Sequence, residues 1–319
     1  MTFSTDIFET PDGINLRFGV QTPENVRQHV LILQGRGEYI ERYQETADEL
    51  AERGFGCVTF DFRGHGGSSR ETADTAMGYI HDVAHYITDV RHVINHISKA
   101  RGIACPLLIT HSTGGLVAMA MMLDQPDLWE SVVMIAPFFG LGGPDWLSLA
   151  AQFVADSMCR YGFDKQYLPG QRKLSPLAGF EAENILTSDP VRHARNVAIL
   201  QSSPNLVVGG VSAGWLDACF KAQASLTTRI EQMKAGTCPL PPVTIVLAGN
   251  DQVVSNQTTE DLFGNVPSIT IAEIPEARHE ILQERDIYRN RFWQIFDAHV
   301  ARTQKKLTPG NLGGDLNEF

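Results

Sequence analysis

The sequence predicts an α/β domain built on a mostly parallel sheet, and three observations support this fold class. Short apolar runs recur along the chain, and most are followed by a turn-rich segment and then by a helical pattern. These runs are continuous rather than alternating, which is typical of strands that are buried on both faces. The alternation of apolar strand-like runs and helical segments stops after Ala136 and resumes at Val243, which predicts one large insertion.

Composition limits the class of protein. The 319 residues carry a formal net charge of −11, which argues against nucleic-acid binding and against electrostatic attraction to anionic membranes. The N-terminus lacks the basic start and apolar core of a signal peptide, and no run approaches membrane-spanning length. We therefore expect a cytoplasmic protein with at most transient, peripheral and hydrophobic membrane contact. The oligomeric state is left open.

The residues that could bind a metal do not form a recognisable site. The cysteines are odd in number and scattered without a Cys-x-x-Cys pair, which predicts reduced, packed thiols and no zinc site: Cys57, Cys105, Cys159, Cys219 and Cys238. A helix predicted over 78–99 carries a stripe of candidate ligands: His81, His85, Asp89, His92 and His96. The alternatives are a metal site and a solvated helix face. We favour the solvated face, since an active-site cleft is expected at strand ends, and we expect neither metal nor cofactor.

The first strands lead to a glycine-rich loop. Alternating residues on both sides of Pro11-Asp12-Gly13 predict an antiparallel hairpin at a sheet edge. The apolar strand Val30–Leu33 then runs into Gln34-Gly35-Arg36-Gly37-Glu38, which leaves backbone N–H groups free. This loop lacks the signatures of a P-loop or a dinucleotide fingerprint. We expect it to stabilise an anion of another kind.

A serine stands at the turn between the next strand and its helix. After the strand Phe55–Phe60, the apolar run at 107–109 predicts a buried strand, and the apolar residues from Leu116 onward predict a helix. Ser112 lies at the tight corner between them, followed by Gly114 and Gly115. The pattern is Gly-x-Ser-x-Gly with Thr110 in place of the first glycine. The alternative is a serine that merely caps the helix.

The second half of the chain completes the predicted organisation. Strands are expected at Ser131–Ala136, Val243–Ala248 and Ile269–Ile274, and a final helix at 285–302. Residues 1–137 and 237–302 would form the core, residues 138–236 a helical lid, and residues 303–319 a flexible tail. An insertion at a strand's carboxyl end overhangs the active-site edge, which favours the lid; the alternative is a subdomain that only adds stability.

Three residues at strand ends have the chemistry of a nucleophilic hydrolase. Ser112, Asp251 and His279 occur in that chain order, which is the order of the hydrolase triad. His279 would accept the proton of the serine hydroxyl, and Asp251 would orient the imidazole. His111 is a weaker candidate for the base because it adjoins Ser112, and His65 is weaker because it lies in a glycine turn.

The transition state would also need two hydrogen-bond donors for the developing oxyanion. We assign the backbone N–H groups of Thr113, at the start of the helix, and of Arg36, in the glycine-rich loop. The side chain of Arg36 is expected to be incidental to this role.

These motifs resemble the serine α/β-hydrolases of the monoacylglycerol lipase and bacterial lysophospholipase branch. The catalytic matches are Gly35, Gly37, Glu38, Asp61, Arg63, Gly64, Gly66, Ser68, His111, Ser112, Gly114, Gly115, Asp251 and His279. The insertion matches bacterial lysophospholipase-like sequences at Asn184, Leu186, Thr187, Asp189, Arg192, Gly210, Gly214, Trp215 and Leu216. Gln34 and Thr110 depart from the pattern. The resemblance covers nearly the whole chain before the tail and implies an α/β-hydrolase fold with a helical lid.

The resemblance implies a serine esterase that needs no cofactor and cleaves a small-molecule ester or a single-chain lipid, such as a lysophospholipid or a monoacylglycerol. Aromatic residues of the insertion are candidates for lining an acyl groove, although aromatic residues at helical spacing more often serve as packing: Phe138, Phe139, Trp146, Phe153 and Trp215. The alternatives are a small-ester hydrolase or peptidase on the same scaffold and, suggested by Gln34 and Thr110, a non-catalytic binding protein.

Overall fold

A mixed eight-stranded sheet forms the centre of the computed structural model, which describes residues 2–171, 177, 180, 184–234 and 240–307. The spatial order of the strands is β1-β2-β4-β3-β5-β6-β7-β8. The pairs β1–β2 and β2–β4 are antiparallel, and all other neighbours are parallel. The strands are β1 Ser4–Glu9, β2 Asn15–Gln21, β3 Gln28–Leu33, β4 Phe55–Phe60, β5 Leu107–His111, β6 Ser131–Ile135, β7 Val243–Ala248 and β8 Ile269–Ile274.

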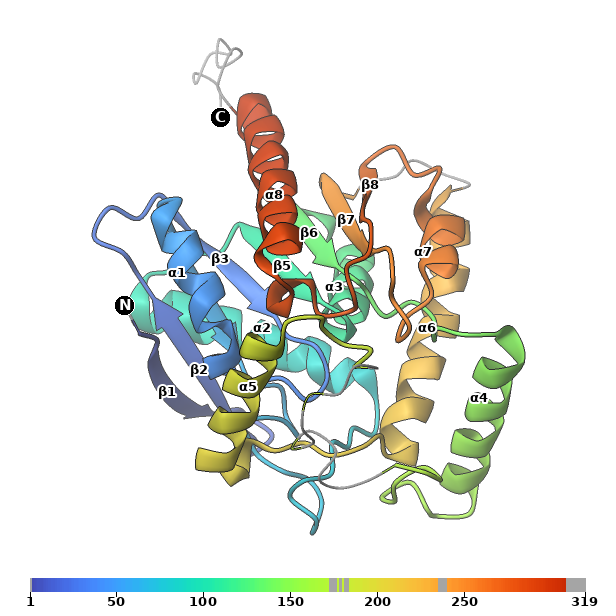
Figure 1. Cartoon of the computed structure of the whole chain (residues 1–319). Helices are drawn as coiled ribbons and strands as arrows, with labels where there is room; N and C mark the ends of the chain where they lie inside the picture. The colour runs from blue at the N-terminus through green and yellow to red at the C-terminus, as the bar shows by residue number, and fades with distance from the viewer. Residues whose placement is uncertain (1, 172–176, 178–179, 181–183, 235–239, 308–319) are drawn as a thin grey trace, which may run out of the picture.

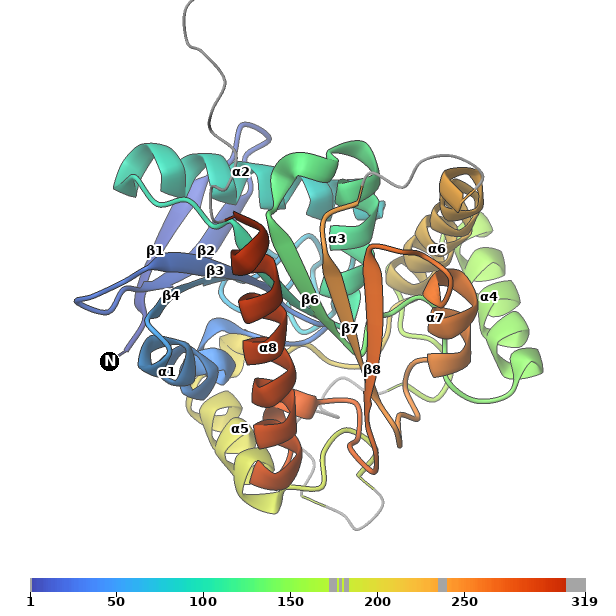
Figure 2. The same ribbon diagram turned by 90° about the horizontal axis from the view of Figure 1, so that it is seen from above.

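Helices cover both faces of the sheet (Figures 1 and 2). Helices α1 and α8 lie on one face, and α2 and α3 lie on the other. The α-helices are α1 Gln44–Glu52, α2 Val83–Arg101, α3 Thr113–Asp124, α4 Asp145–Arg160, α5 Pro190–Ser202, α6 Ala213–Lys234, α7 Asn256–Phe263 and α8 Asp286–Leu307. Short 3-10 helices are η1 Ile40–Tyr43, η2 Pro126–Leu128, η4 Pro204–Leu206 and η5 Ile281–Gln283.

Burial along the strands follows their place in the sheet. Every residue of β4, β5, β6 and β7 is buried, as the continuous apolar runs predict for strands with helices on both faces. Strand β1 is almost entirely exposed and pairs only with β2, so the predicted edge hairpin is confirmed. The parallel strands bring their carboxyl ends to one edge, where the loops after β3, β5 and β7 meet.

The predicted helix with the histidine stripe differs from the observed one. Helix α2 begins at Val83 rather than near residue 78, because the Asp82 carboxylate accepts a hydrogen bond from Ala84 N and caps it. The placement of Asp89 on the histidine face was wrong: its side chain is buried and accepts a 2.7 Å hydrogen bond from Arg63 Nε. His96 stacks on Phe8. Across the described residues, no group of three or more such side chains is placed to hold a metal ion.

Two further features concern the chain end and the cysteines. Helix α8 continues to Leu307, so the predicted start of the tail at residue 303 was wrong, and residues 308–319 lie outside the described part. The described cysteines are free thiols, and Cys238 lies outside the described residues. None of the helices in the described ranges combines the length and apolar character that crossing a membrane requires.

The insertion, residues 138–236, joins β6 to β7 and carries α4, α5 and α6. Helix α6 packs against α3 and α4, whereas α4 lies at the periphery of the molecule. Helix α5 lies on the opposite side, near α1 and the start of α8 (Figures 1 and 2). The two outer helices of the insertion therefore flank the carboxyl edge of the sheet from different sides.

Candidate active site

Ser112 occupies a strained turn between β5 and α3. Its φ of 49° and ψ of −113° lie in a region that non-glycine residues rarely adopt. The chain is held there by a 3.0 Å hydrogen bond from Ser112 N to Ile135 O and another from Phe138 N to Ser112 O. Although Ser112 is the N-cap residue of α3, its hydroxyl makes no capping hydrogen bond. The alternative of a merely capping serine is therefore wrong.

Small residues make this turn possible. A Cβ atom on Gly114 would lie 2.3 Å from Leu33 O, and one on Gly115 would lie 2.6 Å from Pro137 Cβ. The side chain of Thr110, at the position of the motif's first glycine, is buried, and its Oγ1 would lie 3.4 Å from a Cβ on Gly115. The threonine side chain is therefore accommodated beside Gly115, whose lack of a Cβ is required mainly by Pro137.

His279 and Asp251 form a buried hydrogen-bonded pair at the neighbouring strand ends. His279 Nδ1 lies 2.8 Å from Asp251 Oδ2, while Asp251 Oδ1 accepts from the N–H groups of Val253 and Val254. Burial of Asp251 opposes its ionisation, but the bond from His279 and the two backbone donors outweigh this and lower its pKa. The ionised Asp251 holds the proton of His279 on Nδ1, which leaves Nε2 to act as a base.

His111 has a different role from the one its position suggests. Its Nδ1 lies 3.0 Å from Glu38 Oε1, and its Nε2 lies 3.2 Å from the backbone oxygen of His279. Burial alone would lower the pKa of His111, but the charge and hydrogen bond of Glu38 raise it instead. With both ring nitrogens engaged, His111 connects the loop after β3 to the loop that bears His279 and is no rival for the base.

The Glu38 carboxylate was matched to the family motif from the sequence, but its role in the site was not predicted. It accepts hydrogen bonds from Gly35 N and from Tyr43 Oη at 2.6 Å, in addition to its contact with His111. Burial opposes its ionisation, yet His111, Arg42 and Tyr43 together lower its pKa. The available signal was the acidic residue that ends the motif Gly35-Arg36-Gly37-Glu38.

The second rival, His65, lies away from the reacting groups. It is buried in the loop after β4, where its Nδ1 lies 3.1 Å from Arg63 O. Burial is the main cause that lowers its pKa to about 3, so the imidazole is neutral at physiological pH. His65 does not line the cavity beside Ser112.

The loop after β3 faces Ser112 across a cavity. The side chain of Gln34 is buried and donates a hydrogen bond to Thr59 Oγ1, so this departure from the family pattern fits the packing. Arg36 and Thr113, the predicted oxyanion donors, both line the cavity together with Ser112.

The Arg36 side chain, which we expected to be incidental, has contacts of its own. Its Nη2 atom donates hydrogen bonds to the carbonyl oxygens of Gly209 and Gly210, at 2.7 and 2.5 Å. The guanidinium carbon lies 5.2 Å from the ring centroid of Trp215. Arg36 therefore joins the loop after β3 to the insertion.

A cavity of about 650 Å³ lies beside Ser112 and His279. Two of the five predicted groove residues, Phe138 and Trp215, line it, with their rings stacked at a centroid distance of 5.9 Å. Its remaining apolar lining comes mainly from the insertion: Leu141, Leu147, Ala150, Ala151, Val154, Leu168, Pro169, Leu186, Val211 and Leu216, with Val253 from the loop after β7.

The other three predicted groove residues do not line this cavity. Phe139 is buried in the core, where its ring lies 4.9 Å from that of Phe263. Trp146 and Phe153 lie on the outer face of α4 and are 68% and 73% exposed. The reason is helical geometry, because the inward face of α4 carries Leu147, Ala150, Ala151 and Val154. The prediction from aromatic residues placed the correct helix, α4, beside the cavity, but it chose residues on the outward face of that helix.

The insertion also contacts the loop that bears His279. Glu280 N donates a 2.8 Å hydrogen bond to Leu186 O, and Thr187 Oγ1 donates a 2.7 Å hydrogen bond to Gln283 O. The Arg278 guanidinium donates to the carbonyl oxygens of Asn184 and Thr187. Since these bonds lie on either side of His279, the segment before α5 fixes the backbone of the base.

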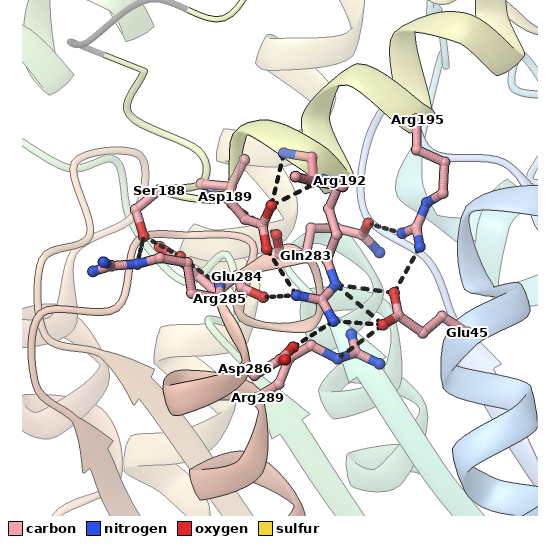
Figure 3. A network of polar contacts seen from close by, with 12 residues as sticks. Glu45, Ser188, Asp189, Arg192, Arg195, Gln283, Glu284, Arg285, Asp286 and Arg289 are labelled. Atoms are coloured by element: carbon pink, nitrogen blue, oxygen red, sulfur yellow. Dashed lines mark hydrogen bonds and ion pairs between the residues drawn. The ribbon is translucent and has the colours of Figure 1, made fainter.

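Charged side chains anchor α5 next to these bonds (Figure 3). Arg192 donates to both oxygens of Glu45 in α1, to Asp189 Oδ2 at 2.8 Å and to Asp286 Oδ1 at 2.7 Å. Arg195 donates to Glu45 and to the side-chain oxygen of Gln283. Burial of Glu45 opposes its ionisation, but the arginines lower its pKa to about 2. Through Arg192, α5 is connected to α1 and to the start of α8.

Comparison with known proteins agrees with this geometry. Residues 24–286 match the Hydrolase_4 family, described as serine aminopeptidase, S33. Lysophospholipase L2 of Escherichia coli K12 is 25% identical over 297 residues, covering 89% of this chain and 83% of that protein. Monoacylglycerol lipase of Mycolicibacterium smegmatis is 22% identical over 286 residues, covering 89% and 92%.

A solved structure confirms the predicted α/β-hydrolase fold. A soluble variant of monoglyceride lipase from Saccharomyces cerevisiae superposes with a TM-score of 0.75 at 20% identity, covering 95% of this chain and 96% of that one. At this identity the likeness concerns the fold alone. The arrangement of chain segments is therefore that of the α/β-hydrolase fold.

Proposed function

We propose that this chain, which belongs to the family described as serine aminopeptidase, S33, cleaves carboxylic esters of single-chain lipids through an acyl-enzyme on Ser112. The observation that carries the proposal is a serine in a strained turn that shares an apolar cavity with an aspartate-bound histidine. The similarity to proteins named lysophospholipase and monoacylglycerol lipase supports the lipid class.

The chemistry follows from the protons that these groups hold. Ser112 Oγ attacks the ester carbonyl carbon as His279 Nε2 takes its proton, and the ionised Asp251 stabilises the imidazolium. The negative charge that develops on the carbonyl oxygen accepts hydrogen bonds from the N–H groups of Thr113 and Arg36. His279 then protonates the departing alcohol, and water hydrolyses the acyl-enzyme by the reverse proton path.

The shape of the cavity favours an acyl chain. Its volume of about 650 Å³ lies within the range of about 300–1,000 Å³ that is typical of ligand pockets. Apolar residues from α4, from α6 and from the segment between them form most of its wall beyond Ser112. In this proposal the insertion acts as a lid over the acyl chain. A cytoplasmic location and transient contact with membranes stay predictions from the sequence.

The family description raises peptide hydrolysis as a second candidate. A free carboxylate in the cavity would form a strong charge-assisted hydrogen bond with the amino terminus of a peptide substrate. The carboxylates among the described residues of the cavity wall are Glu38 and Glu280, and both are engaged, by His111 and by Arg42. This arrangement favours ester over aminopeptidase activity.

The test is labelling by a fluorophosphonate, read by intact mass, together with turnover of esters of increasing acyl length. We expect wild type to gain one adduct and Ser112→Ala to gain none, with an optimum at long acyl chains. A folded wild type that takes no label would refute the nucleophile. Labelling with an optimum at acetyl esters would instead support the small-ester hydrolase, and turnover of aminoacyl amides alone would support the peptidase.

A further inference from the structure

The acidic side chains that line the cavity have basic partners, whereas the basic side chain of Arg36 has no acidic one among the described residues. Glu38 is paired with His111 at 3.0 Å and lies 3.6 Å from Arg42 Nε. Glu280 is paired with Arg42. Each acidic side chain in the described part of the wall thus has a basic partner. Arg36 also lines the cavity, and it forms no ion pair with any described carboxylate.

The guanidinium of Arg36 has unused hydrogen-bonding capacity. Its Nη2 atom donates to Gly209 and Gly210, but those partners are neutral carbonyl groups. Its Nε atom is shielded from solvent and has no hydrogen-bond partner within the described ranges. Burial lowers the pKa of Arg36 to about 10, so the group remains charged at neutral pH. The guanidinium is therefore a buried positive charge beside Trp215 of the cavity wall, without an ion-pair partner among the described carboxylates.

The position of Arg36 suits the alcohol side of an ester. Its backbone N–H is the proposed oxyanion donor, so its side chain starts next to the reacting carbonyl. In a 1-acyl lysophospholipid, only the glycerol carbons and one oxygen separate the scissile ester oxygen from the phosphorus atom. The planar fork of a guanidinium matches the paired oxygens of a phosphate.

We propose that Arg36 binds the phosphate of the substrate's head group and thereby makes this hydrolase prefer lysophospholipids to neutral monoacylglycerols. This inference rests on the proposed esterase function and narrows its substrate class. Arg36 acts as a specificity determinant in two ways: through its backbone on the reacting carbonyl and through its side chain on the head group. The competing explanation is a purely structural arginine that only holds Gly209 and Gly210.

The experiment compares lysophosphatidylglycerol and monoacylglycerol with the same acyl chain, in the same neutral detergent, for wild type, Arg36→Gln and Arg36→Lys. We expect Arg36→Gln to lower kcat/KM on both lipids, because the bonds to Gly209 and Gly210 are lost, but to lower it about 10- to 100-fold more on the phosphate-bearing lipid than on the neutral one. Arg36→Lys, which keeps the charge but loses the fork, should lie between. Equal losses on both substrates would overturn the proposal in favour of the structural role.

A matched control tests whether any loss of positive charge has the same effect. Arg160 lies in the insertion with a side chain that is 75% exposed, and Arg160→Gln should leave the ratio of the two substrates unchanged. If that ratio falls as much as in Arg36→Gln, attraction to a charged micelle explains the effect and the proposal fails.

Binding to a non-hydrolysing variant separates this proposal from the proposed function. Dodecyl phosphate should bind Ser112→Ala about tenfold or more tightly than dodecanol does, and adding Arg36→Gln should remove that difference. Wild type that cleaves neither lipid would refute the proposed function, while this assay still decides the role of Arg36. Dodecyl phosphate binding that is unaffected by Arg36→Gln would overturn the proposal. Dodecanoate in the same assay distinguishes phosphate from carboxylate recognition, and tighter binding of dodecanoate would also overturn it.

Discussion

The two outer helices of the insertion are attached to the protein by different forces. Helix α5 is joined to α1 and α8 by the hydrogen bonds and ion pairs of Arg192, and the segment before it contacts the His279 loop. Helix α4 packs against α6 and turns large apolar side chains outward. Hydrogen bonds, which depend on direction, therefore lie beside His279, where a small displacement would affect catalysis. Apolar packing, which does not depend on direction, surrounds the acyl cavity.

This difference teaches how one insertion can serve two purposes. Charged hydrogen bonds fix both distance and angle, which suits a loop whose imidazole must meet a hydroxyl. Apolar contacts tolerate sliding, which suits a wall that admits acyl chains of different lengths. We expect the charged side to control kcat and the free energy of unfolding, and the α4 side to control substrate preference.

The largest expected effect concerns the orientation of the base. Asp251→Asn should lower kcat on the order of 10⁴-fold, because an amide at this place favours the wrong tautomer of His279. Steady-state kinetics on a soluble ester measures this, and an unchanged melting temperature would serve as the folding control. Activity within about tenfold of wild type would mean that Asp251 does not orient the base.

The next effect concerns the buried pair of Glu38 and His111. Glu38→Gln should destabilise the fold by about 3–5 kcal/mol, because it leaves His111 without its charged partner. The pKa of Glu38 is lowered from 4.5, so its stabilising share is present above that pH and is lost as pH falls. The pKa of His111 is raised from 6.5, so its share is present below that pH and is lost as pH rises.

Urea unfolding as a function of pH tests this pair. The difference between wild type and Glu38→Gln should be greatest near about pH 5.5 and smaller at about pH 9. His111→Asn, which removes the other partner, should show the same trend. A difference that grows toward alkaline pH would contradict a raised pKa of His111.

A smaller effect is expected for the anchor of α5. Arg192→Met should lower the free energy of unfolding by about 2 kcal/mol, because its partly buried guanidinium has charged partners on α1, on α8 and at the N-cap of its own helix. It should also lower kcat, since the segment before α5 contacts the His279 loop. Arg160→Met, which removes an i,i+4 pair with Asp156 on α4 in which the arginine side chain is 75% exposed, is the matched control and should leave the free energy of unfolding nearly unchanged. Equal effects of the two variants would show that α5 is not specially anchored.

The smallest effect belongs to the outer face of α4. Phe153→Ser should change the free energy of unfolding by less than about 0.5 kcal/mol, because the side chain is 73% exposed. The control is Val154→Ser, on the cavity-facing side, which should alter the acyl-length preference. Destabilisation by Phe153→Ser of more than about 2 kcal/mol would show that this face is covered in solution.

Much of the fold could be predicted because it depends on local patterns. Continuous apolar runs identified the parallel strands, as in Val243–Ala248, and the turn around Pro11-Asp12-Gly13 identified the edge hairpin. The boundaries of α2 and α8 were less accurate. Capping by Asp82 depends on one polar side chain and is not visible in an apolar pattern, and α8 extends to Leu307.

By itself the sequence determined the elements and the order of the proposed triad, because the spacing of apolar residues and the small side chains after Ser112 act within a few residues. Only the tertiary structure decided which distant side chains meet. His111 reaches Glu38 and the backbone of His279, Arg192 connects three helices, and Arg36 lies in the cavity wall without a described carboxylate partner. Such contacts depend on the mutual placement of whole elements, which no local pattern specifies.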